Sequence, residues 1–297
     1  MTAHALVFVA SPEDKPAYRE ALLMLGRVAL NRKLPPPEVL SGWESAQWIY
    51  DSVDGELRQE AAAAVAELPV DWALVPVEGR RKKLLIADMD STIINVECLD
   101  ELADFAGIKA EIAAITERAM RGELEFEPAL RERVGKLKGL ALDALQRTYD
   151  ERVRLNPGAA TLVKTMAAHG ASCVLVSGGF TYFTSRVAEL AGFHRHFANT
   201  LLDDGSVLTG EVKEPILGRA AKLQHLVEEA KLGGATPRIA LAIGDGANDL
   251  SMIKAAGLGV AYRAKPLVAA EADAKIDYMS LEAALFFQGY RRGEFVQ

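Results

Sequence analysis

The chain has 297 residues, half of them hydrophobic, and a formal net charge of -7 at pH 7. This length allows two domains with a buried core, while the acidic balance argues against nucleic acid or an anionic membrane surface as the main partner. Cys98 and Cys173 are its two cysteines, which is typical of a reducing compartment. The apolar stretch 5–10 is too short for a membrane span and lacks a basic region before it, so we expect a soluble, cytoplasmic protein.

The first 80 residues alternate short apolar stretches with helical patterns, which predicts a small α+β unit. These stretches lie at residues 6–9, 17–30, 46–50, 57–68 and 72–77. The polar run Gly79 to Lys83 follows them. We therefore expect a domain boundary near residue 80, between an N-terminal domain at 1–80 and a second domain at 81–297.

After residue 83 apolar strands alternate with helices, the pattern of an α/β fold with a doubly wound parallel sheet. The candidate strands lie at residues 84–87, 172–176, 239–243 and 258–261. Between the first two, residues 97–155 are helical in pattern and rich in charge, and they are too many for a simple crossover. The sequence therefore predicts a helical cap inserted over the active edge of the sheet.

Four carboxylates follow the ends of two predicted strands. Asp88 and Asp90 come after the first strand and project to the same side of an extended chain. Asp245 and Asp249 follow the third strand, where single acids commonly cap a turn or a helix. Clustered carboxylates destabilise a fold unless a cation lies between them, and such oxygen donors suit Mg²⁺. The pattern predicts a metal-dependent site.

The strand at 172–176 is followed by Ser177-Gly178-Gly179, before a helix that starts near Phe180. Glycines let backbone N–H groups approach an anion closely, and a helix N-terminus favours negative charge. A phosphate therefore fits this position, although the same residues could form only a turn and a helix cap. Because ligands bind beyond the carboxyl ends of the strands in open α/β sheets, we expect these groups to share one edge with the carboxylates.

These motifs together resemble the haloacid dehalogenase superfamily of phosphatases, whose four motifs occur in this order. The matching residues are Asp88-x-Asp90-x-Thr92, Ser177, Lys222 and Gly244 to Asp249. More narrowly, three segments resemble the phosphoserine phosphatases of that superfamily: residues 88–97, 126–134 and 176–180. The resemblance covers about residues 84–277 and implies a HAD-like sheet with an inserted cap.

The resemblance implies a covalent mechanism. Asp88 would attack phosphorus and form an aspartyl-phosphate. Asp90 would protonate the leaving oxygen and then take a proton from the hydrolytic water. Mg²⁺ would be held by Asp88, the backbone carbonyl of Asp90, Asp245 and Asp249.

The resemblance also assigns substrate contacts. The groups expected around the phosphoryl oxygens are Ser177, Gly178, Gly179, Lys222 and Asn248. In the cap, Glu97 would bind an ammonium and Arg133 a carboxylate, while Met120 and Phe126 would flank the serine methylene. Alternatively, Met120 and Phe126 belong to the cap core, and Arg133 forms a surface pair along its helix.

The predicted function is Mg²⁺-dependent hydrolysis of O-phospho-L-serine to L-serine and phosphate, the last step of serine biosynthesis. One alternative is a capped phosphatase of another small monoester, which has no use for Glu97 together with Arg133. Another is a non-catalytic amino-acid sensor, against which the intact Asp88, Asp90, Lys222 and Asp249 argue. The N-terminal unit resembles the small ACT-type domains of bacterial phosphoserine phosphatases, and it could bind an effector, steady the cap or form a homodimer contact.

Overall fold

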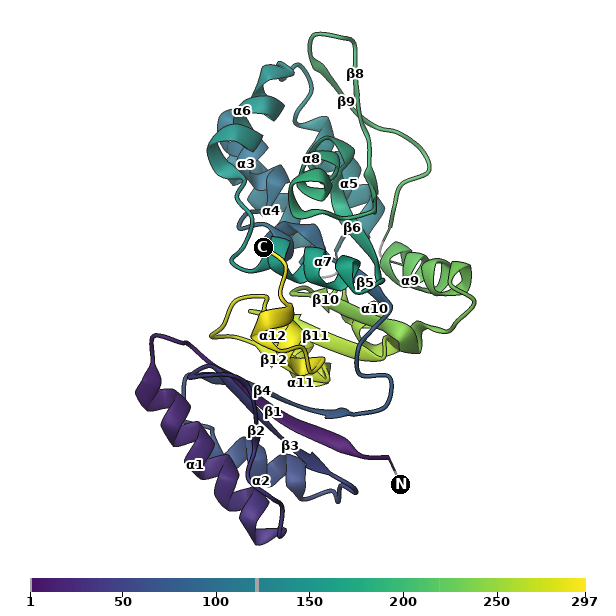
Figure 1. The fold of residues 1–297 in the computed structure, drawn as a ribbon. Coiled ribbons are helices and arrows are strands. Elements are labelled where there is room, and N and C mark those ends of the chain that lie inside the picture. Colours follow the sequence, from purple (N-terminus) through teal and green to yellow (C-terminus); the bar gives the residue numbers. More distant parts are fainter. Residues whose placement is uncertain (1, 121–122, 219) are drawn as a thin grey trace.

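A ten-stranded sheet runs through the molecule (Figure 1). The computed structural model describes residues 2–120, 123–218 and 220–297. Across the sheet the strands are β2 (Glu38–Ser41), β3 (Ser45–Tyr50), β1 (His4–Ala10), β4 (Val70–Pro76), β12 (Ala274–Ile276), β11 (Leu258–Tyr262), β10 (Ala240–Gly244), β5 (Leu84–Ala87), β6 (Ser172–Phe180) and β7 (Arg195–Asn199).

The N-terminal part contributes four antiparallel strands, β1 to β4, with helices α1 (Lys15–Asn31) and α2 (Leu57–Ala64). Its βαββαβ order and strand arrangement are those of the ferredoxin-like fold. Helix α1 starts after Asp14, whose carboxylate accepts a 3.0 Å hydrogen bond from the N–H of Ala17. Its buried residues recur every three or four positions, so one face of α1 packs on the sheet.

The other face of these four strands packs against helix α12 (Ala283–Phe287), near the end of the chain. Strand β4 also pairs antiparallel with β12, which joins the N-terminal strands to the parallel part of the sheet. Arg80 is buried at this junction and donates to the carbonyls of Phe286 and Phe287 and to the side chain of Gln47. The sheet is thus continuous across residue 80, and the division into two domains there stays a prediction.

The remaining six strands are parallel, which confirms the predicted doubly wound α/β sheet. The chain builds outward from β5 through β6 to β7, then returns to the other side of β5 and builds from β10 to β12. The strand order therefore reverses between β5 and β10, the position where open α/β sheets bind ligands. Its helices are α7 (Ala159–Ala168), α8 (Thr181–Ala191), α9 (Ala221–Leu232), α10 (Leu250–Ala255) and α11 (Pro266–Glu271).

The inserted cap forms four helices above the carboxyl ends of the strands (Figure 1). They are α3 (Cys98–Phe105), α4 (Lys109–Met120), α5 (Phe126–Gly135) and α6 (Asp143–Arg152). A hairpin that the sequence patterns did not predict, β8 (Leu201–Asp203) with β9 (Leu208–Val212), packs against α5. Leu208 exchanges backbone hydrogen bonds with Gly139 and Leu140, so the hairpin is tied to the cap.

Short turns complete the described secondary structure: an irregular, non-helical turn at Met89–Ile93, closed by a hydrogen bond from the N–H of Ile94 to the carbonyl of Met89, and 3₁₀ turns at Pro237–Ile239 and Arg292–Glu294. None of the helices within the described ranges is both long and apolar enough to cross a membrane.

Candidate active site

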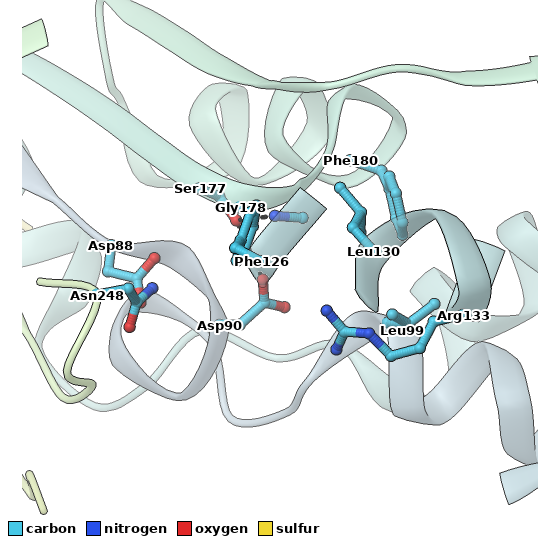
Figure 2. A pocket seen from close by; sticks show the side chains of 11 residues that line it. Asp88, Asp90, Leu99, Phe126, Leu130, Arg133, Ser177, Gly178, Phe180 and Asn248 are labelled. Carbon is cyan, nitrogen blue, oxygen red and sulfur yellow. Dashed lines mark hydrogen bonds between the residues drawn. The ribbon is translucent and has the colours of Figure 1, made fainter. Parts of the chain in front are cut away.

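The predicted motifs meet where the parallel strands end. Asp88 follows β5, Asp245 follows β10, and Ser177 lies in β6. Because β5 is hydrogen-bonded to both β10 and β6 in parallel register, these residues share one edge of the sheet. Figure 2 shows Asp88, Asp90 and Ser177 facing one another across this edge.

The loop after β5 is shaped by its own buried residues. Met89 is fully buried and belongs to the hydrophobic core beneath the site. Ser91 takes a left-handed conformation with φ 56°, which turns the chain sharply. The side-chain amide of Asn156 donates to the carbonyls of Thr92 and Ile94 and stabilises the turn.

Lys222 lies between two carboxylates in the interior of the site. Its ammonium is 2.6 Å from Asp88 Oδ1 and 2.5 Å from Asp249 Oδ1. Burial alone would lower the pKa of Lys222, but the two carboxylates outweigh it and raise the pKa. Burial and the nearby Asp249 raise the pKa of Asp88, while Lys222 opposes them. Lys222 is therefore a buried cation and not a solvated surface lysine.

Three carboxylates offer a candidate metal centre. Oxygen atoms of Asp88, Asp245 and Asp249 all lie within 4.8 Å of one another. Thr92 Oγ1 donates a 2.9 Å bond to Asp245, and the N–H of Gly246 donates a 3.0 Å bond to Asp249. Such converging, oriented oxygen donors fit a hard divalent cation like Mg²⁺.

Asp90 is held differently from the other three acids. Its Oδ1 accepts a 2.9 Å bond from the N–H of Cys98, and its Oδ2 accepts a 3.1 Å bond from Ser177 Oγ. Burial raises the pKa of Asp90, although these donors oppose the rise. The side chain of Asp90 is not part of the carboxylate cluster of Asp88, Asp245 and Asp249. The predicted contact of Asp90 with the metal runs through its backbone carbonyl and stays a prediction.

The glycines after Ser177 allow close packing. A Cβ on Gly179 would lie 2.9 Å from Asp90 Oδ2 and 3.0 Å from Ser177 Oγ, so any larger residue would displace the acid. A Cβ on Gly178 would lie 3.5 Å from Cζ of the Phe126 ring. The N–H of Gly179 donates a 2.8 Å bond to Ser177 Oγ.

A cavity of about 110 Å³ lies between the sheet edge and the cap (Figure 2). Its lining combines the motif residues with cap residues: Asp88, Asp90, Leu99, Phe126, Leu130, Arg133, Ser177, Gly178, Gly179, Phe180 and Asn248. Lys222 lines a smaller adjoining pocket with Gly178 and Asn248. The structure thus brings Phe126 and Arg133 from the cap to the same cavity as Asp88.

Arg133 points from α5 toward Asp90 (Figure 2). Its Nε donates a 3.3 Å bond to the carbonyl of Ala129, one turn back, and it forms no ion pair with a residue that the structure describes. Burial lowers the pKa of Arg133, opposed by Asp100 and Glu97. Its partly buried guanidinium is thus available to an anionic group in the cavity.

Glu97 is exposed and is not among the residues that line the cavity. Its Oε1 accepts a 2.7 Å bond from Ser91 Oγ. Although the residue is exposed, partial desolvation of its carboxyl group by the surrounding protein and the nearby Asp90 raise its pKa to about 7. Met120 ends α4, and its side chain lies outside the described residues.

Several cavity residues escaped the sequence patterns, namely Leu99, Leu130 and Phe180. Leu130 lies four residues after Phe126 and three before Arg133, so all three share one face of α5. That spacing was visible in the sequence and could have identified Leu130. Phe180 belongs to the segment 176–180 that carries the family resemblance and could have been identified from it, whereas no comparable signal marks Leu99.

A model of the haloacid dehalogenase-like hydrolases matches residues 85–254. Because the match spans more than half of the chain, the chain belongs to this family. A phosphoserine phosphatase of Polaromonas sp. (strain JS666) is 47% identical over 208 residues, 68% of this chain and 88% of that protein. A phosphoserine phosphatase of Vibrio cholerae serotype O1 is 38% identical over 245 residues, which are 82% of this chain and 74% of that protein. Within the family, the chain is accordingly a phosphatase of the phosphoserine phosphatase group.

Solved structures agree with this placement. A probable phosphoserine phosphatase from Vibrio cholerae, in unliganded form, has a TM-score of 0.77 at 32% identity and covers 96% of this chain and 86% of its own. A phospho-aspartyl intermediate analogue of phosphoserine phosphatase has a TM-score of 0.64 at 39% identity, covering 69% and 98%. A HAD family hydrolase from Salmonella enterica serovar Typhi has a TM-score of 0.83 at 28% identity, covering 97% and 98%.

Proposed function

We propose that this phosphatase hydrolyses O-phospho-L-serine to L-serine and phosphate, with Mg²⁺ as cofactor and an aspartyl-phosphate intermediate. The observation that carries the proposal is the cavity itself. It has the buried Asp88, which is paired with Lys222 of the adjoining pocket, on one side and an arginine without a described ion pair, Arg133, on the other. A phosphate ester that carries a second anionic group would place its phosphate near Lys222 and its second anion near Arg133.

The first half-reaction forms a bond between Asp88 and phosphorus. A carboxylate oxygen of Asp88 attacks, the bond from phosphorus to the serine oxygen breaks, and Asp90 gives its proton to the departing oxygen. In the second half-reaction water attacks the phosphorus of the aspartyl-phosphate. Asp90 takes the proton from that water, and Asp88 leaves as a carboxylate. The raised pKa of Asp90 supports its acidic role, because a proton is held there before transfer.

The carboxylates of Asp88, Asp245 and Asp249 would hold Mg²⁺, whose charge would stabilise the phosphoryl oxygens in the transition state. Thr92 and Gly246 orient two of these ligands by hydrogen bonds. Lys222 provides a fixed positive charge beside the nucleophile. The ammonium of Lys222 would also bind phosphoryl oxygens electrostatically, and it compensates the repulsion between Asp88 and Asp249.

The phosphoryl group would lie between Asp88 and the loop of Ser177. Ser177, Gly178, Gly179 and Asn248 line this part of the cavity, and Lys222 lines the adjoining pocket. The hydroxyl and backbone N–H groups of the loop are neutral donors suited to phosphoryl oxygens, and the lysine adds charge.

Selectivity for phosphoserine would come from the cap. Arg133 would bind the substrate carboxylate, Glu97 the ammonium, and Phe126 would pack on the short methylene chain. The raised pKa of Glu97 suits this role, because an arriving ammonium stabilises the ionised carboxylate. Action in serine biosynthesis and a cytoplasmic location belong to the same proposal and rest on the resemblance to phosphoserine phosphatases.

The test is a phosphate-release panel of small monoesters, measured with and without Mg²⁺. We expect phosphoserine to be the preferred substrate and a chelator to abolish turnover. Preference for a phosphate ester without the ammonium and carboxylate would favour a capped phosphatase of another small monoester. No release from any ester would favour an amino-acid sensor.

A further inference from the structure

Asn199, the last residue of β7, makes three hydrogen bonds that join the end of β6 to the segment before α9. Its side chain is buried, with 3% of the residue exposed. The amide Nδ2 donates to the carbonyls of Gly178, at 3.0 Å, and Leu217, at 3.4 Å. Its Oδ1 accepts a 2.7 Å bond from the N–H of Leu217. Both N–H groups and the oxygen of this buried amide are therefore used.

These bonds fix the orientation of the amide and the type of residue. If the amide were flipped, its oxygen would face two carbonyls and its NH₂ group would face an N–H. An aspartate would meet the same conflict and would also bury a negative charge. Asn199 is the chemically suitable residue for this position.

One of the two segments is Ser177 to Gly179 at the end of β6, to which the proposed function assigns the phosphoryl group. Asn199 donates to the carbonyl of Gly178, and Ser177 Oγ accepts from the N–H of Gly179. The peptide group between the two glycines is therefore hydrogen-bonded through both its oxygen and its N–H. Ser177 in turn donates to Asp90 Oδ2. Asn199 thus fixes the peptide that joins Gly178 to Gly179.

The other segment leads into α9. Leu217 and Gly218 line the small pocket that also contains Gly178 and Lys222. Asn199 therefore sets the spacing between two walls of this pocket, the Gly178 wall and the Leu217 wall. Figure 2 shows Gly178 next to Ser177 at the upper side of the main cavity.

We propose that Asn199 is a positioning residue for the phosphoryl group. Asn199 acts by fixing the backbone at Gly178 and Leu217, and it does not contact the substrate. The proposal rests on the proposed function and deepens it. Because Asn199 acts on the phosphate end alone, its loss should affect every phosphate ester equally, whatever the rest of the substrate.

The test compares Asn199→Ala with wild type in the presence of MgCl₂. We expect kcat/KM to fall at least about tenfold for phosphoserine and for an aryl phosphate alike, because small misplacements of reacting groups are costly. The affinity for inorganic phosphate, measured by calorimetry, should fall in parallel. The ratio of the two kcat/KM values should stay at its wild-type value.

Gln288→Ala is the matched control. Gln288 is also a buried amide that donates to a backbone carbonyl, that of Ala284, and accepts from the N–H of Lys82, but it lies away from the cavity. It should lower the melting temperature and leave both kinetic constants and phosphate affinity unchanged. A merely structural role of Asn199 would give the same pattern as the control and would overturn the proposal.

Two other outcomes are equally decisive. A loss confined to phosphoserine would contradict a role at the phosphate end. If Asn199→Ala does not fold, Asn199→Ser is measured in the same way, and wild-type constants in that variant would overturn the proposal. If wild type does not hydrolyse phosphoserine, the proposed function fails, while the calorimetric comparison with inorganic phosphate still tests Asn199.

Discussion

The hydroxyl of Thr92 donates a 2.9 Å hydrogen bond to Oδ1 of Asp245, across 153 positions of sequence. Thr92 is fully buried after β5, and Asp245 follows β10, so the bond spans the point where the strand order reverses. Burial raises the pKa of Asp245, and the Thr92 donor opposes that rise. The bond therefore orients a proposed metal ligand and favours its ionised form.

Replacing Thr92 by valine keeps the volume and removes this donor. We expect the Mg²⁺ concentration for half-maximal activity to rise roughly tenfold or more, the usual effect of losing a group that orients a metal ligand. Thr148→Val is the control, because Thr148 is also fully buried and its hydroxyl donates to the carbonyl of Ala144 in the cap. Equal Mg²⁺ requirements in the two variants would remove Thr92 from this role.

Asp88→Asn tests the nucleophile. The change keeps the shape of the side chain and removes the attacking charge, so nearly all turnover should be lost and no label from substrate should be trapped on the protein in acid. Asp104→Asn alters an exposed carboxylate on the cap, which pairs with Arg152, and should keep wild-type turnover. Turnover near wild type in Asp88→Asn would refute the covalent mechanism.

Arg133→Ala tests the substrate. Removing the proposed partner of the substrate carboxylate should lower kcat/KM for phosphoserine by about 2 to 5 kcal/mol of transition-state stabilisation. Hydrolysis of an aryl phosphate that has no carboxylate should change much less. Arg131→Ala, on the same helix but paired with Glu214 at the surface, should leave both rates unchanged. An unchanged ratio of the two kcat/KM values in Arg133→Ala would show that Arg133 does not bind the substrate carboxylate.

Asp71 predicts a pH dependence of stability. It is buried and accepts hydrogen bonds from the N–H groups of Asp277, Tyr278 and Met279, yet burial raises its pKa to about 6. Because the folded pKa lies above the unfolded one, the protonated form favours folding. Its contribution is complete below pH about 4 and is lost as the pH rises through about 6.

The measurement is urea unfolding of wild type and Asp71→Asn from pH 4 to 7. The stability of wild type relative to the variant should fall by about 3 kcal/mol over this range, an order-of-magnitude value for a shift of two units. Asp54→Asn should show the opposite slope, because Arg32 lowers the pKa of Asp54. A relative stability of wild type that rises with pH would show that the three backbone donors outweigh burial at Asp71.

Local sequence signals predicted the central strands and the motif positions well. Strand β5 matches its predicted range 84–87, and β10 and β11 differ from theirs by one residue at most at each end. These strands are buried on both faces and therefore appear as continuous apolar runs. The HAD-like fold with its inserted cap is confirmed. The individual roles of the site residues stay predictions.

What the sequence did not predict depends on contacts between distant segments. Strand β7, at the edge of the sheet, has mixed polarity, and β12 has three residues, so neither gives a recognisable apolar run. The bonds from Asn199 to Gly178 and Leu217 connect residues 21 and 18 positions apart through side-chain geometry, which no local pattern encodes. The ACT-like relationship of the N-terminal unit and a homodimer also stay predictions.

The continuous sheet has a consequence for synthesis of the chain. The N-terminal strands are complete at residue 76, but the partner of β4 and the helix that covers their second face lie at residues 274–287. At typical translation speeds, about 200 further residues require roughly 10 to 40 seconds. During that interval the nascent chain exposes an apolar sheet face and an unpaired strand edge, so this is the stage at which chaperones have the most to protect.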